Sequence, residues 1–280
     1  MLKNILVRSL SGAVYVALIV TAVLLLENSP TVFLVVFSLF AAWGIKEIYG
    51  MVRIQGQESW LLMGLDMLGG VGLFLAMFIA MRPDGFRSGL WLLPPCVYVV
   101  MRLVAQLYRP EQDAVKSLSR SMLGMCYVAF PLSMLNAIVG MSSPRTLLAV
   151  FVFIWINDTG AFLTGVTLGR HRLWERISPK KSWEGFFGGV VFCVLAALAF
   201  DRWLNEFFQV PQLGVWVGLS VLVAVVATLG DLVESLLKRT VGVKDSSHLI
   251  PGHGGLLDRI DSLLLVAPAV MVFLYLVINN

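Results

Sequence analysis

Long apolar stretches separated by short charged segments dominate the chain, and this alternation restricts its fold more than any other feature. Of its 280 residues, 58% are hydrophobic and 14% are charged. An average soluble domain is about 45–50% apolar and about 25% charged. About 20 mostly apolar residues are enough to cross the hydrocarbon core of a bilayer as a helix. We therefore predict an all-α, polytopic membrane protein that forms a single transmembrane domain.

Nine apolar stretches are predicted to span the membrane. They cover residues 9–26, 28–45, 59–81, 88–104, 121–141, 146–166, 185–200, 210–231 and 262–279. The fourth is the weakest, because Pro94 and Pro95 interrupt it and a short apolar segment can also be re-entrant. The first lacks small residues at a cleavage position, which favours an uncleaved helix over a signal peptide. Residues 1–145 would be mainly scaffold, and residues 146–280 would carry the motifs.

The basic residues of the predicted loops indicate an orientation. With nine crossings, 17 of the 21 Lys and Arg residues fall on one side of the membrane and 4 on the other. Cytoplasmic loops are enriched in Lys and Arg, so this division predicts that the amino terminus lies in the cytoplasm. The membrane is predicted to be the cytoplasmic (inner) membrane. Omitting the fourth helix reverses the amino terminus but leaves the later loops cytoplasmic. The same bias accounts for the net charge of +4, and no nucleic acid is expected as a partner.

Several acidic residues are predicted at one depth, near the cytoplasmic ends of the later helices. They are Asp158, Asp231, Asp258 and Asp261. A charged side chain inside a bilayer costs on the order of 3 kcal/mol on insertion scales, so such residues are functional candidates. For Asp258 and Asp261 a second interpretation is that they complement the dipole at the start of the ninth helix.

The eighth predicted helix carries further polar residues beyond Asp231. Glu234, Ser235 and Lys238 follow at the i+3, i+4 and i+7 positions, so all four side chains share one face if the helix continues into the cytoplasm. A continuous helix would thus present both acids and a base on the same side. The spacing predicts one polar cluster at this helix end.

The loop that follows combines glycines with basic residues. The glycines are Gly252, Gly254 and Gly255, and the basic residues of the loop and its flanks are Lys238, Arg239, Lys244 and Arg259. Glycines let backbone N–H groups approach an anion closely. Carboxylates suit a hard cation, and basic side chains suit phosphate. Together with the acids, the loop predicts a metal-and-phosphate site, in which His253 orders the loop or donates to phosphate, because oxygen-rich magnesium sites rarely use imidazole.

A second basic cluster lies between the sixth and seventh predicted helices, around Lys180 and Lys181. Its simpler interpretation is ordinary cytoplasmic charge with Trp183 as an interfacial anchor. That interpretation is adopted for Arg170, Arg172 and Arg176. For Lys180 and Lys181, phosphate binding stays open beside it. No role is assigned to His171 or His248.

Several segments together resemble the signature of the phosphatidate cytidylyltransferases, also called CDP-diacylglycerol synthases. They are Ser235-Leu-Leu-Lys238-Arg239, Lys244-Asp245, Pro251-Gly-His253-Gly254-Gly255-Leu-Leu-Asp258-Arg259-Ile-Asp261, Asn157-Asp158-Thr-Gly-Ala-Phe and Ser178-Pro-Lys-Lys-Ser-Trp-Glu-Gly. The resemblance covers roughly residues 150–262. The amino-terminal half matches only in hydropathy and in its Arg8-x-x-Ser11-Gly12 start.

The resemblance implies transfer of CMP from CTP to phosphatidic acid, giving CDP-diacylglycerol and pyrophosphate for phospholipid biosynthesis. It also implies a magnesium requirement, with room for a second cation, and a homodimer surrounded by membrane lipids. On this hypothesis Asp231, Asp258 and Asp261 hold Mg²⁺. Lys238, Arg239, Lys244 and Arg259 bind the β- and γ-phosphates, together with His253 and the backbone from Gly252 through Gly254 to Gly255. Ser178, Lys180 and Lys181 would hold the lipid phosphate or the attacked phosphoryl group, with Ser235, Asn157 and Asp158 as further candidates.

Three rival functions fit parts of the pattern. A membrane lipid kinase that uses CTP as phosphoryl donor could place acids and bases in a similar site, and product analysis would separate the two. A transporter also places charges within helices, but it predicts charges spread along a midplane path rather than clustered at one interface. A CDP-alcohol phosphotransferase would carry an Asp-Gly motif followed by spaced Asp residues, which the sequence lacks.

Overall fold

The computed structural model describes residues 2–53, 59–109, 113–208, 212–247, 249 and 254–278, with side chains from residue 10 onward. Helices make up nearly all of it, and the sheet found in these residues is a two-stranded hairpin. The chain divides into two compact units. The first comprises residues 1–140 and 243–259, and the second comprises residues 141–242 and 260–280.

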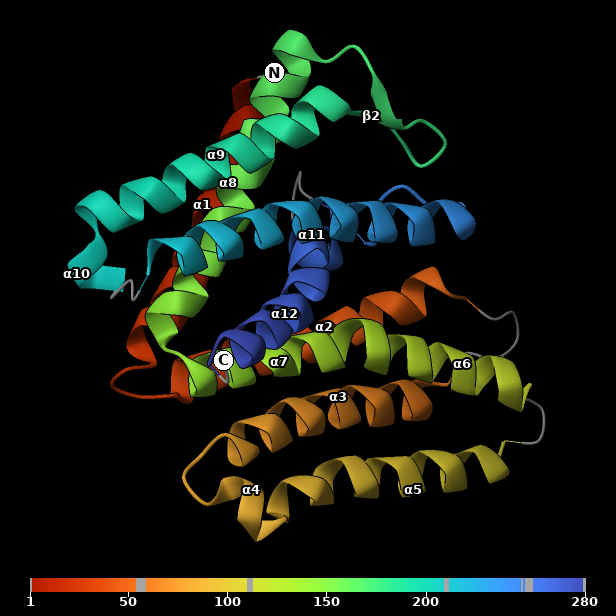
Figure 1. Ribbon diagram of the computed structural model, residues 1–280. Coiled ribbons are helices and arrows are strands. Elements are labelled where there is room, and N and C mark those ends of the chain that lie inside the picture. Colours follow the sequence, from red (N-terminus) through yellow and green to blue (C-terminus); the bar gives the residue numbers. More distant parts are fainter. Residues whose placement is uncertain are drawn as a thin grey trace. The chain divides into compact units, whose positions relative to one another are not determined.

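The first unit is a layer of helices joined by short connections. Its elements are α1 (Leu2–Leu25), α2 (Thr31–Met51), α3 (Trp60–Ala80), α4 (Gly85–Ser88), η1 (Leu90–Leu92), α5 (Leu93–Leu107), α6 (Ala114–Gly124), η2 (Met125–Ala129) and α7 (Phe130–Met141). In Figure 1, α2, α3, α5 and the α6–α7 pair run alongside one another. The rings of Phe33, Phe37 and Phe74 pack between α2 and α3, with centroids 4.7 and 5.9 Å from Phe33. This buried aromatic cluster holds the two helices together.

One helix of the first unit contains a wide turn. The π-helical turn Met125–Ala129 joins α6 to α7, so that Ala114–Met141 forms one apolar segment of 28 residues. Pro131 follows it and has no N–H to donate to the carbonyl of Tyr127, while its ring would clash with that carbonyl in a regular helix. The wider turn relieves the clash and lets the helix continue.

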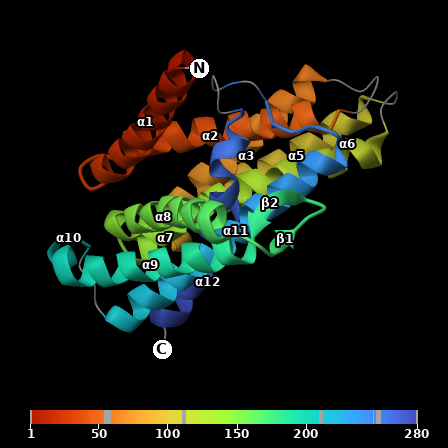
Figure 2. The ribbon, with the colours of Figure 1, turned by 90° about the horizontal axis from the view of Figure 1, so that it is seen from above.

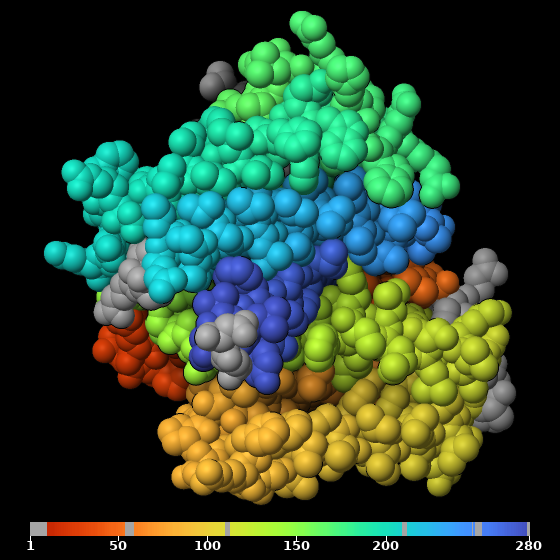
Figure 3. Space-filling view, in the orientation of Figure 1, coloured from red at the N-terminus to blue at the C-terminus, as the bar shows by residue number. Residues whose placement is uncertain are grey.

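The second unit consists mainly of four long helices and a small hairpin. Its elements are α8 (Pro144–Leu168), β1 (Arg172–Trp174), β2 (Ser178–Ser182), α9 (Trp183–Trp203), α10 (Asn205–Phe208), α11 (Leu213–Thr240) and most of α12 (Leu257–Ile278). The first three residues of α12 belong to the first unit. The hairpin lies at the start of α9 in Figure 2, and Figure 3 shows the side chains of α9 packed against those of α11. A Cβ at Gly188 would lie 2.0 Å from Thr164 Oγ1, so glycine is what lets α8 and α9 approach this closely.

The structure confirms a polytopic, all-α membrane protein. Within the described residues, eight helical segments are long and apolar enough to cross a membrane, and α1 adds a shorter apolar stretch, Leu10–Leu25. These segments coincide with the nine predicted stretches. The fourth begins rather than breaks at its prolines, because Pro94 and Pro95 lie in the first turn of α5, where their missing N–H groups would have no helical partner. Nine crossings and their orientation stay predictions.

Several predicted helix ends were wrong, and three of them have one reason in common. The sequence placed helix ends at the first charged residues, at 45 and 231, and placed the last helix start at 262. In the structure α2 continues to Met51, α11 continues to Thr240, and α12 begins at Leu257. Each extension carries acids that have partners within their own unit, and a paired charge does not end a helix.

Two basic residues counted as loop charges are buried inside the first unit. Arg102 is 3% exposed and Arg120 is 2% exposed. Arg102 forms an ion pair with the buried carboxylate of Asp66, with Nε 3.1 Å from Oδ1. It also donates to Ser117 Oγ and Ser121 Oγ, each at 2.9 Å. Arg102 therefore contributes to helix packing, and neither of these two buried arginines is an exposed loop charge of the kind that the predicted orientation counted.

Candidate functional site

The best candidate for a functional site is a cavity of about 370 Å³ in the second unit. Asn157 and Asp158 of α8, Lys180 and Lys181 of β2, and Asp231 of α11 all line it, together with apolar side chains. Three segments that are distant in sequence therefore supply predicted site residues to one cavity. Ser178 shares the strand with the two lysines but is not among the described lining residues.

The hairpin brings the two lysines to the cavity, and the start of α9 anchors it. Ser182 caps α9, with its Oγ accepting the Gly185 N–H at 3.1 Å. The Glu184 carboxylate accepts the backbone N–H groups of Arg170 and His171 at 3.1 and 3.2 Å, and it lies 2.6 Å from His171 Nδ1. These contacts tie the chain leaving α8 to the first turn of α9. No role was assigned to His171 from the sequence, and the structure shows that it stabilises the hairpin by binding Glu184.

Lys181 is the basic residue held most firmly in the cavity. Its Nζ lies 2.8 Å from Asp231 Oδ2 and donates to the carbonyl of Thr228 at 3.2 Å. Both acceptors belong to α11, one turn apart. An ammonium group has three N–H donors, and these two contacts occupy two of them. No described residue accepts the third, so Lys181 can donate to a ligand in the cavity.

Asp231 and Asp261 form the acidic part of the site. Asp261 is partly buried and interacts electrostatically with Asp231, Asp158 and Lys238. Asp231 also accepts a hydrogen bond from Ser235 Oγ at 3.2 Å, one turn further along α11. Two carboxylates in a low-dielectric setting favour a bound cation or a shared proton. The i, i+4 pairing of Asp231 and Ser235 follows the predicted helical spacing.

A glycine permits the approach of the two helices that carry these acids. A Cβ at Gly230 would lie 2.9 Å from the Asp261 carbonyl oxygen and 2.9 Å from Ser262 Cα. Real Cβ atoms rarely come so close to backbone, so a larger residue would push α12 from α11. Gly230 precedes Asp231 directly, and it therefore sets the spacing of the two carboxylates.

Lys238 and Arg239 lie further along α11, and the structure separates their roles. Lys238 is 8% exposed and forms an ion pair with Glu234, which is fully buried. Arg239 is exposed in the last turn of the helix. The predicted face of Asp231, Glu234, Ser235 and Lys238 is thus one continuous helical surface, as expected. Lys238 partly neutralises Glu234. The helical spacing placed Glu234 on this face, but no function was assigned to it from the sequence.

The glycine-rich loop belongs to the first unit, where Glu47 of α2 organises it. The Glu47 carboxylate accepts the hydroxyls of Ser246 and Ser247 at 2.8 and 2.7 Å. It also accepts the backbone N–H groups of Leu256 and Leu257 at 2.8 and 2.9 Å. One buried carboxylate therefore fixes both ends of the described loop. Glu47 was missed from sequence, although a lone acid beside an apolar stretch was a usable signal.

Asp258 also binds this loop. Its Oδ2 accepts the Ser246 N–H at 2.9 Å, the Ser246 hydroxyl at 3.0 Å and the Gly255 N–H at 2.8 Å. Gly254 has a φ of +80°, a left-handed conformation that favours glycine, and a Cβ there would lie 2.5 Å from Asp258 Oδ2. Lys244 and Arg259 are exposed, and the Arg259 carbonyl accepts the Tyr15 hydroxyl at 2.9 Å. Gly252 and His253 lie outside the described residues.

The acids of the second unit fit a magnesium ion better than a structural metal. Among the described residues, no three or more acidic, histidine or cysteine side chains gather closely enough to form a metal cage. Magnesium usually keeps several waters and is bound through one or two carboxylates plus substrate phosphates. Asp231 and Asp261 supply that number of carboxylates. The third predicted ligand, Asp258, belongs to the other unit and carries three hydrogen bonds on one oxygen.

The fold defines a polytopic membrane protein, and its second unit contains a cavity lined by two lysines and two aspartates. A family model of the cytidylyltransferase family matches residues 6–277, so the chain belongs to that family. The match extends far beyond the region of resemblance recognised from sequence and includes the first unit.

Individual relatives match over a shorter region. The chain is 41% identical over 132 residues to a phosphatidate cytidylyltransferase of Staphylococcus epidermidis, covering 46% of this chain and 49% of the relative. Identity to the enzyme of the same name from Staphylococcus aureus is 42% over 130 residues, covering 46% and 48%. For that of Haemophilus influenzae it is 43% over 133 residues, covering 47% and 46%. The matched region thus spans about half the length of these curated relatives.

Proposed function

We propose that the protein is a phosphatidate cytidylyltransferase, which transfers CMP from CTP to phosphatidic acid and releases pyrophosphate. The observation that carries this proposal is the placement of Lys181, Lys180 and Asp231 around one cavity of a membrane protein from the cytidylyltransferase family. The names of its relatives support the choice of lipid substrate. Diacyl chains stay in the leaflet while CTP is soluble, so a membrane-embedded protein can serve both substrates.

The reaction joins two anions, and this sets what the residues must do. An oxygen of the phosphatidic acid phosphate attacks the α-phosphorus of CTP, a new P–O bond forms, and the bond to the β-phosphate bridging oxygen breaks. A phosphate monoester is largely dianionic near neutral pH, so no side chain has to remove a proton. Positive groups must instead offset repulsion and the charge of departing pyrophosphate. The absence of a Ser-His pair from our hypothesis follows from this requirement.

The geometry supports specific roles on this proposal. Lys181, with one N–H left for a ligand, would hold a phosphate oxygen while Asp231 and the Thr228 carbonyl orient it. Lys180 lines the same cavity and is exposed, which suits the lipid phosphate or the attacked group. Arg239, Lys244 and Arg259 are exposed, and their role in binding the β- and γ-phosphates stays a prediction from the sequence. Asn157 and Asp158 would shape the cavity wall.

Magnesium is proposed as the cofactor, held by Asp231 and Asp261. When bound, it would supply positive charge to the triphosphate and help to orient it. The roles predicted for Asp258 and His253, and for the backbone of Gly252 to Gly255, stay predictions. The cytoplasmic position of the site and the inner-membrane location also stay predictions. So does the homodimer, which the size of the purified protein in detergent would test.

The test is product analysis with the purified full-length protein. Labelled CTP and phosphatidic acid should give CDP-diacylglycerol and pyrophosphate, chelation should abolish the reaction, and added Mg²⁺ should restore it. Formation of CDP with a phosphorylated lipid would instead make the protein a CTP-dependent lipid kinase. Failure to form either product would overturn the proposal.

The metal assignment needs a variant that leaves the loop intact. Asp258→Asn would disturb the hydrogen bonds to Ser246 and Gly255, so loss of activity there would have two explanations. Asp261→Asn avoids this, and we expect it to raise the Mg²⁺ concentration needed for half-maximal activity. Asp201→Asn, near the end of α9 and outside the cavity, is the matched control. An unchanged Mg²⁺ dependence in Asp261→Asn would rule out its role as a ligand.

A further inference from the structure

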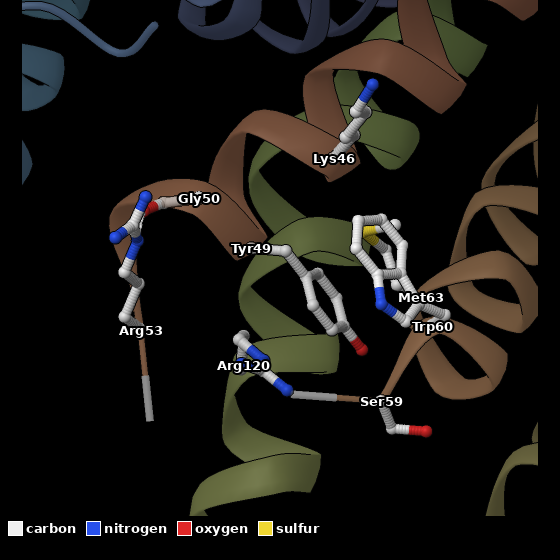
Figure 4. Close-up of a pocket in the computed structure, with 8 residues that line it drawn as sticks. All are labelled: Lys46, Tyr49, Gly50, Arg53, Ser59, Trp60, Met63 and Arg120. Atoms are coloured by element: carbon white, nitrogen blue, oxygen red, sulfur yellow. Dashed lines mark hydrogen bonds between the residues drawn. The ribbon is translucent and has the colours of Figure 1, made fainter. Parts of the chain in front are cut away.

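A second cavity lies in the first unit, where α2 ends and α3 begins (Figure 4). Its volume is about 190 Å³, and its lining includes Lys46, Tyr49, Arg53, Ser59, Trp60 and Arg120. About 10–15 Å³ of such volume is enough to hold one water molecule, so the cavity has room for a tetrahedral phosphate group. Neither the predicted signature nor the site proposed above uses any of these residues.

The cavity is lined by positive charge. Lys46 lies near the end of α2, Arg53 lies two residues beyond the end of that helix, and Arg120 approaches from α6. None of the described lining residues is acidic. Two acids on the same helices are engaged elsewhere: Asp66 with Arg102 and two tyrosine hydroxyls, and Glu47 with the loop that follows α11. The positive charge of the cavity therefore lacks a carboxylate counterion among the lining residues that the structure describes.

Arg120 is the residue that points to a ligand. Its side chain is 2% exposed, and its guanidinium carbon lies 3.9 Å from the centre of the Tyr49 ring. Nη1 donates weakly to the Val52 carbonyl at 3.4 Å. Nε and Nη2 are buried and have no hydrogen-bond acceptor in the described part of the chain. Buried donors on a charged group are costly to leave unpaired, so an acceptor in this cavity would be strongly favoured.

The spatial arrangement suits phosphate in particular. In Figure 4 the Arg120 side chain reaches from α6 toward Tyr49 and Ser59. A guanidinium presents N–H groups in a planar fork that matches two oxygens of one phosphate. The Ser59 hydroxyl oxygen accepts the Leu62 N–H at 3.3 Å, which leaves its proton for a further acceptor. Arg120, Ser59 and Lys46 thus contribute a guanidinium, a hydroxyl and an ammonium group to the lining of one cavity.

We propose that this cavity is a second phosphate-binding site, separate from the site of cytidylyl transfer. Trp60 is 76% exposed beside it, and Trp43 lies under the Lys46 ammonium at 3.9 Å. Tryptophans gather where the bilayer meets water, at the depth of lipid phosphates. The phosphate can therefore come from an anionic lipid headgroup or from free phosphate in solution. Neither source depends on the enzyme activity proposed above.

The experiment uses the full-length protein in nanodiscs. One series contains phosphatidylcholine alone, and the other adds phosphatidylglycerol, whose phosphodiester is not a substrate of the proposed reaction. Bound phosphatidylglycerol is counted by native mass spectrometry, and inorganic phosphate is titrated into the phosphatidylcholine series with thermal unfolding as the readout. We expect Arg120→Gln to bind the favoured ligand about tenfold more weakly, which corresponds to about 1.4 kcal/mol.

Lys116→Gln is the matched control, because Lys116 lies one turn before Arg120 on α6 and its side chain is 69% exposed. A phosphatidylglycerol effect specific to Arg120 identifies a lipid site, and a phosphate effect specific to Arg120 identifies a site for the free anion. Either supports the proposal. Should Arg120→Gln fail to fold, the double variant Lys46→Gln with Arg53→Gln provides the same comparison at less buried positions. Equal binding of both ligands by the pocket variants and the control overturns it.

Discussion

Each unit contains an ion pair between a lysine or arginine and an aspartate, and the two pairs differ in what surrounds them. In the first unit, Asp66 and Arg102 have side chains 1% and 3% exposed. In the second, Asp231 and Lys181 have side chains 38% and 24% exposed and line a cavity of about 370 Å³. One pair is sealed within helices, and the other faces space that a ligand can enter.

The hydrogen-bond partners sharpen the difference. Asp66 accepts the hydroxyls of Tyr49 and Tyr98, and Arg102 donates to two serines and to Gln106 Oε1 at 3.1 Å. Lys181 retains a donor with no acceptor among the described residues. A satisfied buried pair fixes helix packing, whereas a partly satisfied pair on a cavity can exchange protein contacts for ligand contacts. The number of hydrogen-bond partners, more than the charges themselves, distinguishes the two pairs.

The largest expected effect tests the structural pair. Asp66→Asn leaves Arg102 buried without a full counterion, which should lower the free energy of unfolding by about 3–5 kcal/mol. Chemical denaturation in detergent measures this. Asp84→Asn is the control, since Asp84 pairs with Arg87 at 3.9 Å while 85% exposed, and a change below about 1 kcal/mol is expected. A similar loss of unfolding free energy in both variants would contradict the structural role of the buried pair.

The pair of Lys181 and Asp231, which we propose to be functional, should affect activity instead. Lys181→Met should lower kcat/KM about 10²–10³-fold, the loss of about 2.7–4 kcal/mol that follows removal of one electrostatic contact in a transition state. Unfolding free energy should stay near that of the wild type, because the pair is partly exposed. Lys116→Met controls for loss of a basic side chain. A destabilised but fully active Lys181→Met protein would reverse the assignments of the two pairs.

Glu47 combines features of the two pairs. It is buried, as Asp66 is, but it organises the loop that carries part of the family signature. Glu47→Gln replaces charge-assisted hydrogen bonds with weaker ones and should cost about 1.5–3 kcal/mol. Hydrogen exchange at the amides of Leu256 and Leu257 should accelerate, since Glu47 accepts both. Glu206→Gln, in the short helix α10, is the control and should leave exchange at the amides of Leu256 and Leu257 unchanged. Unaltered protection in Glu47→Gln would show that other contacts hold the loop.

The smallest expected effect concerns the spacing of the two acids. Gly230→Ala adds a Cβ 2.9 Å from the backbone of α12, and such overpacking costs about 1–3 kcal/mol. Gly214 lies on the same helix, and a Cβ there would have no neighbour within 4 Å among the described residues, so Gly214→Ala should be nearly neutral. We also expect a higher Mg²⁺ requirement in Gly230→Ala only. Equal behaviour of the two variants would show that α12 adjusts freely.

Hydropathy located nearly all of the helices, the signature segments contained Asp158, Lys180 and Lys181 of the cavity, and predicted depth and helical spacing singled out Asp231. Two acids were missed: Glu47, which organises the loop, and Asp66, which forms the buried pair. Both lie near or within stretches that were interpreted as apolar, and their partners could not be identified locally. Glu47 meets Ser246 across 199 residues of sequence. Spacing within one helix relates residues three or four apart, but it has no information about such a distant partner.

The sequence by itself determined the membrane class, the helical fold and the family, because hydropathy and motif residues act over short windows that add along the chain. The tertiary structure decided which charges pair, which arginines are buried, and that Lys180, Lys181, Asp158 and Asp231 line one cavity. The physical reason is that electrostatic and hydrogen-bond energies depend on distance in space. That distance is set by helix packing, where residues such as Gly230 control how closely two backbones approach.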